Sequence, residues 1–336
     1  MKSKWWFASP EFPQQGCSRL VGTTEAGSQD WQFREAQKLS ITVEGVWVHE
    51  DLDGPLAGDN DLVVATRHRA GERPILDKIH FYKQEVPAPG WVGALFHPLV
   101  LASPDFRSDE LDELTIEVLV HDEDSISDET ASKIEGVIAA GTQAAAIAFP
   151  VMAPFAGLAS HVASAVVGLI DRLNDHDPIV EGRIRLSASG PPAQGRDLLQ
   201  PGFLVCFGEE VDASSLFLDQ RRRVCREEGA RLVEQRDLSY AVLRVSRTAL
   251  RTPDMLIDQR AATLLSEIQR GKGDQQAHAL EFVRETFQAY TALKKLARFR
   301  ELSRKDQPTP DEARLLQELT ADETVRALLP TLDRSA

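Results

Sequence analysis

The sequence predicts an α+β multidomain protein: an antiparallel β-sandwich with an apolar helical-hairpin insert, then a small β-α-β unit and a C-terminal helical region. Three observations support this prediction. Short β-like runs, separated by Asp, Gly and Pro, recur between 40 and 187. One long segment within them carries no charged side chain. Beyond 253, apolar residues recur at helical spacing.

The β-sandwich is predicted over 39–190, after an irregular N-terminal arm at 1–38 that is rich in Trp, Gln, Gly and Ser. Several short strands at regular spacing are typical of an antiparallel sandwich. Its strands are expected at 41–48, 61–68, 78–86, 93–102, 114–121 and 177–187. At 336 residues, the chain is long enough for two or three domains with cores of their own.

A linker, GPPAQG at 190–195, separates the sandwich from the rest of the chain. The β-α-β unit is predicted over 196–250, from apolar runs at 202–207 and 239–246 and an Arg- and Glu-rich helix at 219–232 between them. The helical region covers 253–336. Pro253, Pro310 and apolar spacing predict its helices, near 254–270, 275–303 and 310–329.

Charge and cysteine content restrict the partners and the compartment. The chain has 38 Lys and Arg against 52 Asp and Glu, a formal net charge of −14, which disfavours nucleic acid as a partner. Cys17, Cys206 and Cys225 have no C-x-x-C spacing, so neither a disulfide framework nor a zinc site is indicated. The first 20 residues lack the apolar run of a secretory signal. We therefore expect a cytoplasmic protein.

Two clusters of carboxylates lie at the ends of expected strands. The first is HEDLDG at 49–54 with GDNDLVV at 58–64, and the second is VHDEDSISDE at 120–129. Calcium takes about six to eight oxygen ligands, which Asp-rich loops provide when they are brought together. The alternative is that these residues only form turns, because Asp, Asn and Gly suit turn conformations.

The acidic clusters resemble the loops of the C-two domain family, the calcium- and lipid-binding β-sandwich of protein kinase C and synaptotagmin. The resemblance covers about 40–187 and rests on a D-x-x-G-like loop, an Asp that opens the next strand, and a D-x-D pair with a later Asp. It departs from the family in the apolar insert and in the short spacing to the last Asp. It implies calcium as the cofactor and membrane lipid as a partner. The ligands that it implies are Asp53 (or Asp51, with both kept as candidates), Asp61, Asp122, Asp124 and Asp128.

The apolar insert is predicted over 134–173. Its 35 residues from Gly136 to Ile170 include no Asp, Glu, Lys or Arg, and Pro150 and Pro154 divide it into two helices. Each helix is short or marginal against the roughly 20 residues that span a bilayer, so a simple transmembrane anchor is not expected. A hairpin that enters the membrane after a trigger is one interpretation, and a helical pair buried in the core or at an oligomer interface is the other. The candidate membrane or interface residues are Val137, Ile138, Ile147, Phe149, Phe155, Leu158, Val166, Val167, Leu169 and Ile170.

No phosphate loop, dinucleotide fingerprint, nucleophile elbow or zinc helix occurs in the sequence, so we expect no enzymatic activity. Cys206 is interpreted as a buried structural residue, and Arg221–Arg223 as part of a salt-bridged helix face. The leading hypothesis is a membrane-acting protein that docks on lipid and inserts its hairpin. The architecture and the Ala-, Arg- and Asp-rich composition suggest a bacterial toxin or defence effector. The alternative is a soluble scaffold or assembly subunit whose apolar helices are covered by a protein partner or by a second copy.

Overall fold

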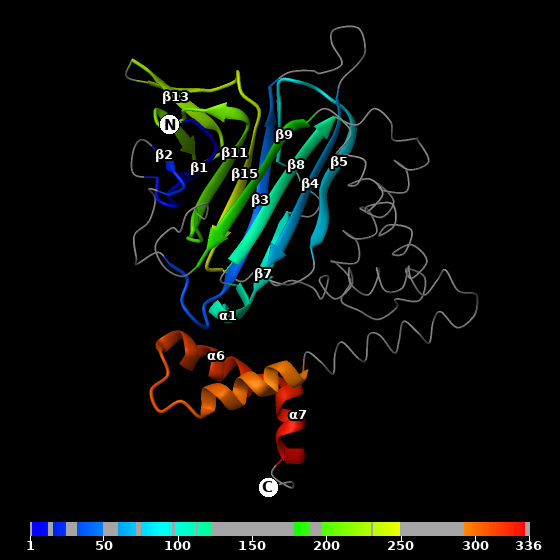
Figure 1. Ribbon diagram of the computed structural model, residues 1–336, viewed down its shortest axis with the longest axis vertical. Helices are drawn as coiled ribbons and strands as arrows, with labels where there is room; N and C mark the ends of the chain where they lie inside the picture. Colours follow the sequence, from blue (N-terminus) through cyan, green and yellow to red (C-terminus); the bar gives the residue numbers. More distant parts are fainter. Residues whose placement is uncertain are drawn as a thin grey trace, which may run out of the picture.

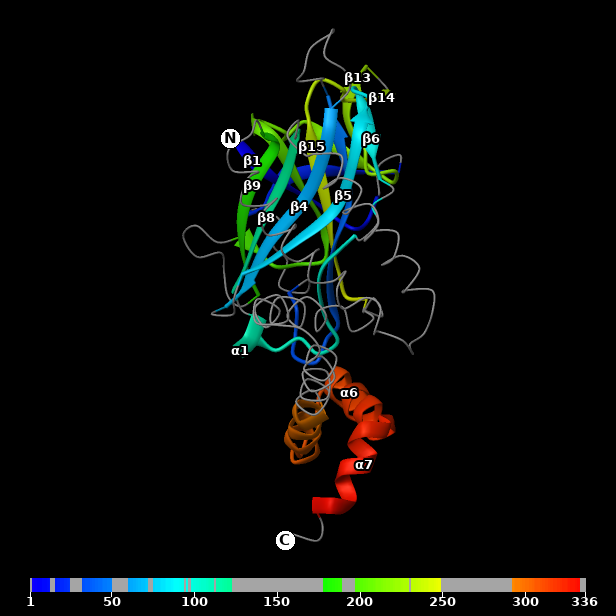
Figure 2. The same ribbon diagram turned by 90° about the vertical axis from the view of Figure 1, so that its right-hand side faces the viewer.

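The computed structural model describes residues 2–12, 16–24, 32–49, 60–71, 75–93, 95, 98–111, 113–122, 178–188, 197–229, 231–248 and 292–332. Within these residues the chain forms two sheets that share a hydrophobic core, with helices at one end of the sheets (Figures 1 and 2). Every strand pair is antiparallel apart from β9 and β10. The fold is therefore a β-rich α+β fold, as the sequence predicts.

The larger sheet runs in the order β14-β13-β12-β2-β1-β11-β15-β3-β6, with β7 also paired to β3. Its strands are β1 (Ser3–Ala8), β2 (Cys17–Gly22), β3 (Leu39–Val48), β6 (Gly90–Val92), β7 (Leu99–Ser103), β11 (Gly202–Val211), β12 (Leu216–Asp219), β13 (Val224–Glu228), β14 (Arg231–Glu234) and β15 (Tyr240–Ser246). Because β1 pairs with β11 and β15 pairs with β3, segments from the beginning and the end of the β-region lie side by side.

The smaller sheet runs in the order β10-β9-β8-β4-β5. Its strands are β4 (Asn60–Ala70), β5 (Leu76–Val86), β8 (Glu113–Asp122), β9 (Pro178–Ser187) and β10 (Asp197–Leu198). Four strands of this sheet match predicted runs, and the run at 41–48 is β3 of the larger sheet. Among the described residues of the run predicted at 93–102, the strand is β7, which begins at Leu99.

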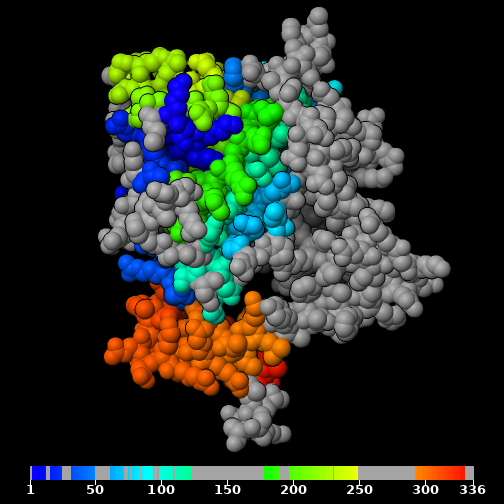
Figure 3. Space-filling view, in the orientation of Figure 1, coloured from blue at the N-terminus to red at the C-terminus, as the bar shows by residue number. Residues whose placement is uncertain are grey.

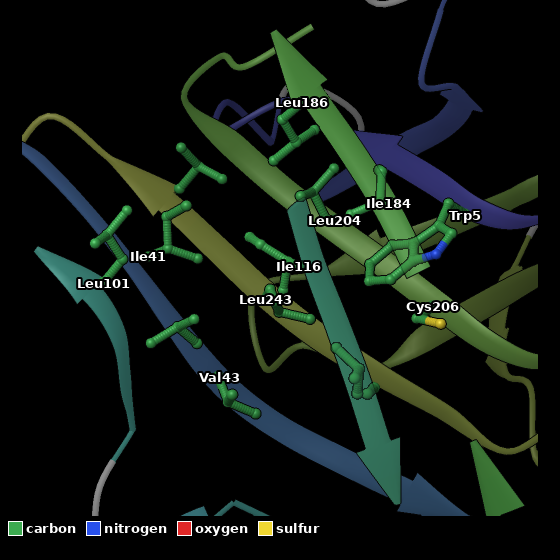
Figure 4. Close-up of a cluster of buried hydrophobic side chains, with 14 of the residues drawn as sticks. Trp5, Ile41, Val43, Leu101, Ile116, Ile184, Leu186, Leu204, Cys206 and Leu243 are labelled. Carbon is green, nitrogen blue, oxygen red and sulfur yellow. The ribbon is translucent and has the colours of Figure 1, made fainter. Parts of the chain in front are cut away.

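The two sheets are held together by one apolar cluster. Figure 4 shows Ile184 of β9 and Ile116 of β8 pointing towards Leu204 and Leu243 of the larger sheet. The sheets approach closely at Gly182 of β9, where an added Cβ atom would lie 2.3 Å from the Cys206 sulfur. Since interiors are close-packed, this glycine sets how closely the sheets approach one another.

The larger sheet is buried on both faces over much of its width. Along β1, Trp5 and Phe7 join the core between the sheets, while Trp6 and Ala8 join a second apolar cluster on the opposite face. Side chains alternate between the faces of a strand, so a run of consecutive apolar residues suits a strand that is covered on both sides. The second cluster is closed by β12 and β13, which contribute apolar residues including Leu218.

Helices follow the sheets at the C-terminal end of the described chain. They are a helix at 292–303, α6 (Pro310–Ala321) and α7 (Glu323–Leu332). They lie at the end of the sheets that carries α1 (Ser108–Leu111), as Figure 1 shows, and form the orange and red part of the space-filling view in Figure 3. A capping box, in which Thr309 and Glu312 hydrogen-bond each other's backbone, begins α6. Buried Arg298 holds the first helix to the sheets through two bonds to the Asp105 carboxylate, of 2.8 and 3.1 Å.

The prediction of an irregular arm at 1–38 is wrong, because β1 and β2 are strands of the larger sheet. Trp5 and Trp6 are buried on opposite faces of β1. Burial of both large side chains, together with pairing to β2 and β11, makes this segment a central strand. The sheet thus joins segments that the sequence assigned to three separate regions.

The predicted helix at 219–232, and with it the β-α-β unit, is also wrong. This segment forms the end of β12, all of β13 and the first residues of β14, and β13 and β14 pair as a hairpin. Gly229, at φ +65°, takes the left-handed conformation that the turn needs. Arg and Glu favour helices, but here Val224 and Cys225 are buried against the sheet, and that burial overrides the local preference.

Candidate functional site

Two of the six predicted calcium ligands lie next to each other at one edge of the smaller sheet. β4 begins just after the first acidic cluster and β8 ends where the second begins, and Leu62 of β4 is paired with Asp122 of β8. The Asp61 backbone N–H donates to Asp122 Oδ1 over 2.7 Å. Asp61 Oδ1 in turn accepts the Glu85 N–H over 3.1 Å. We call the Asp61 and Asp122 pair the acidic edge.

The two residues of the acidic edge differ in solvent exposure. Asp122 is 7% exposed, whereas Asp61 is half-buried. A carboxylate has about four lone-pair sites, so the single N–H that Asp61 accepts from Glu85 leaves it with capacity to bind a cation. Chemically, the edge offers hard oxygen ligands that backbone hydrogen bonds hold in position.

The other predicted ligands, Asp51, Asp53, Asp124 and Asp128, lie outside the described residues. Within the described ranges, no group of three or more His, Cys, Asp or Glu side chains is placed to hold a metal ion. The acidic edge alone offers two carboxylates, whereas calcium takes about six to eight oxygen ligands.

The apolar insert and all of its candidate membrane or interface residues, Val137, Ile138, Ile147, Phe149, Phe155, Leu158, Val166, Val167, Leu169 and Ile170, lie outside the described residues. In the part of the chain that is described, no helix combines the length and the apolar character needed to cross a membrane.

A row of polar side chains lies in the interior of the smaller sheet. Thr66 of β4 and His80 of β5 share a 2.7 Å hydrogen bond. The Lys78 ammonium donates to the carbonyl oxygens of Leu99 and Val100 in the larger sheet, over 3.1 and 2.8 Å. Lys78 thus links the two sheets at a position where an apolar residue would be usual.

The row also includes His68 of β4, which is buried. Burial shifts the pKa of Lys78 and of His68. It lowers the pKa of Lys78 from its ordinary value of 10.5 to about 8. Burial, and secondarily the charge of Lys78, lower the pKa of His68 to about 4. In both cases a low-dielectric surrounding disfavours the charged form. Neither group contacts the acidic edge in any described interaction, so we assign the row to stability.

The Cys206 thiol has the properties of a structural residue. It is fully buried between the sheets, its sulfur donates to the Phe207 carbonyl oxygen at 3.8 Å, and burial strongly raises the pKa of the thiol. A nucleophilic cysteine needs access to solvent and a stabilised thiolate, and Cys206 has neither.

A pocket of about 320 Å³ lies at one end of the larger sheet and was not predicted from the sequence. We call it the arginine pocket, because every charged residue in its lining is an arginine. It is lined by Pro10, Phe12, Pro201, Gly202, Phe203, Arg222, Arg244, Val245, Ser246, Arg247 and Thr248.

Arg222 is held in place on one wall of the arginine pocket. Its guanidinium lies 4.2 Å from the ring centroid of Phe203 and 5.6 Å from that of Phe12. Its Nε lies 3.3 Å from a Glu44 carboxylate oxygen, and its Nη1 donates to the Gln220 carbonyl oxygen over 2.8 Å. These contacts combine cation–π and charged hydrogen bonds, so the orientation of the side chain is set before any ligand arrives.

Only part of this pocket could be predicted from the sequence. The arginines at 221–223 were predicted to lie on a helix, whereas the structure places them in the turn between β12 and β13. The aromatic wall is formed by segments near 12 and 203, which meet only in the folded sheet. Comparison with protein-family models, with curated proteins and with solved structures found no match to this chain.

Proposed function

We propose that this protein is a non-enzymatic, calcium-dependent membrane-docking protein, in which the acidic edge and the loops that leave from it bind calcium and lipid. The observation that carries the proposal is the 2.7 Å hydrogen bond from the Asp61 N–H to Asp122 Oδ1. It fixes the start of β4 against the end of β8. The two acidic clusters of the sequence therefore leave the smaller sheet from the same edge.

The proposal extends to the architecture around this edge. In this proposal the two sheets form a β-sandwich, and an apolar hairpin at 134–173 follows β8 in the sequence. The second acidic cluster, which would bind calcium, immediately precedes this insert in the sequence. Docking would then bring the apolar helices to the bilayer, and the protein would move between the cytoplasm and the membrane.

Calcium fits the acidic edge better than a transition metal does. The acidic clusters offer carboxylates and backbone carbonyls, the hard oxygen ligands that calcium prefers. Zinc and copper favour nitrogen and sulfur ligands. Cys17, Cys206 and Cys225 are all buried elsewhere in the sheets, and the two histidines of the clusters stand among ten carboxylates.

The test is a calorimetric calcium titration of the wild type and of Asp122→Asn. Asparagine keeps the oxygen that accepts the Asp61 N–H, so the variant removes charge while keeping the local hydrogen bond. The proposal expects calcium affinity to fall at least tenfold. Asp306→Asn, an exposed residue between the first C-terminal helix and α6, is the control and should bind like the wild type. A wild type that binds no calcium, or an Asp122→Asn variant that binds it equally well, would refute the proposal.

A further inference from the structure

The arginine pocket concentrates positive charge in a chain whose net charge is −14. Its lining includes Arg222, Arg244 and Arg247 and no Asp or Glu. We propose that this pocket binds a phosphate monoester with a small apolar or aromatic body. The pocket belongs to the larger sheet, so this inference is independent of calcium binding at the acidic edge.

Arg244 is the side chain best placed to receive such an anion. It lies in β15, paired with Phe203 of β11 on one side and with Thr42 of β3 on the other. The side chain is exposed, and it forms no hydrogen bond or ion pair with any residue in the described ranges. Its backbone is fixed between two strands while its guanidinium remains open to a ligand.

Arg247 adds a second cationic group to the same pocket. Its Nη2 donates to the Gln32 carbonyl oxygen over 3.0 Å, and its guanidinium lies 5.8 Å from the Phe33 ring centroid. Burial, followed by the charge of Arg34, lowers the pKa of Arg247. Arg247 therefore places a second guanidinium in the pocket lining beside Arg244.

The shape of the pocket indicates the size of the ligand. A volume of about 320 Å³ is at the small end of ligand pockets. Pro10, Phe12, Pro201 and Val245 provide apolar surface beside the arginines. Such a space accommodates one anionic group together with a body of about one ring.

A phosphate monoester fits this charge pattern better than a carboxylate does. Near neutral pH it carries a charge of about −1.5 to −2 on three acceptor oxygens, whereas a carboxylate has two oxygens and one charge. Guanidinium groups form paired hydrogen bonds with phosphate oxygens. Arg244 and Arg247, with Arg222 held beside them by Glu44, therefore match the phosphate group. The Thr248 hydroxyl, which accepts a hydrogen bond from the Ser246 hydroxyl, offers a further donor.

The test titrates phenyl phosphate into the full chain by calorimetry, in the presence of a calcium chelator. Arg244→Gln should bind at least tenfold more weakly than the wild type. Arg231→Gln, an exposed arginine of β14 outside the pocket lining, is the matched control and should bind normally. Benzoate, which has the same ring with a carboxylate, should bind more weakly than phenyl phosphate.

Two sources of the phosphate are separated by a second arm, co-sedimentation with vesicles that contain phosphatidic acid, a lipid phosphate monoester. Binding of phenyl phosphate without binding of the vesicles assigns the pocket to a free metabolite. Vesicle binding that Arg244→Gln abolishes assigns it to a lipid headgroup. The inference is overturned if neither probe binds, if Arg244→Gln and Arg231→Gln behave alike, or if benzoate binds as tightly as phenyl phosphate.

Discussion

Replacing Lys78 with Met should change how stability depends on pH. Lys78 is buried, its ammonium has the carbonyl oxygens of Leu99 and Val100 as partners, and no ion pair with a described carboxylate neutralises it. A buried cation without a counter-charge is costly. Methionine has a similar length and no charge, so Lys78→Met removes the titrating group while filling much of the same space.

The size of the effect follows from the pKa of Lys78. That pKa is about 8 in the folded protein, against 10.5 as the ordinary value. Between these values the unfolded chain binds more protons, so the free energy of unfolding rises with pH. The interval corresponds to about 3 kcal/mol, at about 1.4 kcal/mol per pH unit. Below pH 8 both states are protonated, and this contribution stops changing.

The assay is urea unfolding at several pH values from 7 to 10.5, followed by tryptophan fluorescence. Trp5, Trp6, Trp47 and Trp91 all lie in strands of the larger sheet and report on its unfolding. The free energy of the wild type, relative to Lys78→Met, should rise by about 3 kcal/mol across this range. Other titrating groups are common to both proteins and cancel.

Lys83→Met is the control for this prediction, because Lys83 is an exposed residue of the same strand. Its difference from the wild type should stay nearly constant with pH. If the Lys78→Met difference is equally flat, Lys78 titrates as it does in the unfolded chain, and the reasoning from burial is wrong.

Three further predictions concern the packing of the sheets and helices. Gly182→Ala should lower the free energy of unfolding in urea by about 1–3 kcal/mol, because the new Cβ atom would lie 2.3 Å from the Cys206 sulfur. Unchanged stability would contradict the close approach of the sheets. Arg298→Met removes both bonds to Asp105, so hydrogen exchange should accelerate in 292–332 and not in the sheets, and unaltered exchange would argue against this docking contact. The pKa of His68 is about 4 when folded and ordinarily 6.5, so the wild type should lose about 3 kcal/mol as pH falls through this interval. His68→Leu should lose less in the same unfolding assay, and equal acid sensitivity would refute the role of His68.

The strands whose pattern is local were predicted well. The runs at 61–68 and 114–121 are β4 and β8, with one or two residues added at each end, because apolar residues and flanking turn residues mark them clearly. β1 was missed because consecutive aromatic residues give no alternation. Consecutive aromatic residues suit a strand only when both of its faces are buried. The strand that pairs with β1, β11, lies about 200 residues away in the sequence.

For the hairpin of β13 and β14, a strong local pattern predicted the wrong secondary structure. Its Arg and Glu residues have high helix propensity, and that local signal predicted a helix. In the sheet these side chains form ion pairs along and across the hairpin instead, such as Arg226 with Glu228 and Arg223 with Glu234. Pairing with β12 decides the structure, and no feature within the segment reveals that pairing.

Of the two candidate sites, one could be predicted from the sequence and the other could not. Asp61 and Asp122 could be brought together from the sequence, because each lies at the end of a recognisable strand. The arginine pocket could not, because its lining comes from residues near 10, 201, 222 and 244, which are joined by sheet pairing alone. Interactions between distant segments are the part of a fold that local patterns do not specify.

The central claim is that the acidic edge docks this protein on lipid through calcium. Its most direct test is co-sedimentation of the full chain with vesicles of phosphatidylserine and phosphatidylcholine, with calcium and with a chelator. The proposal predicts that the wild type sediments with the vesicles only in calcium, and that Asp122→Asn remains in the supernatant while Asp306→Asn sediments normally. A wild type that ignores the vesicles in calcium, or an Asp122→Asn variant that binds them as well as the wild type, would contradict the claim.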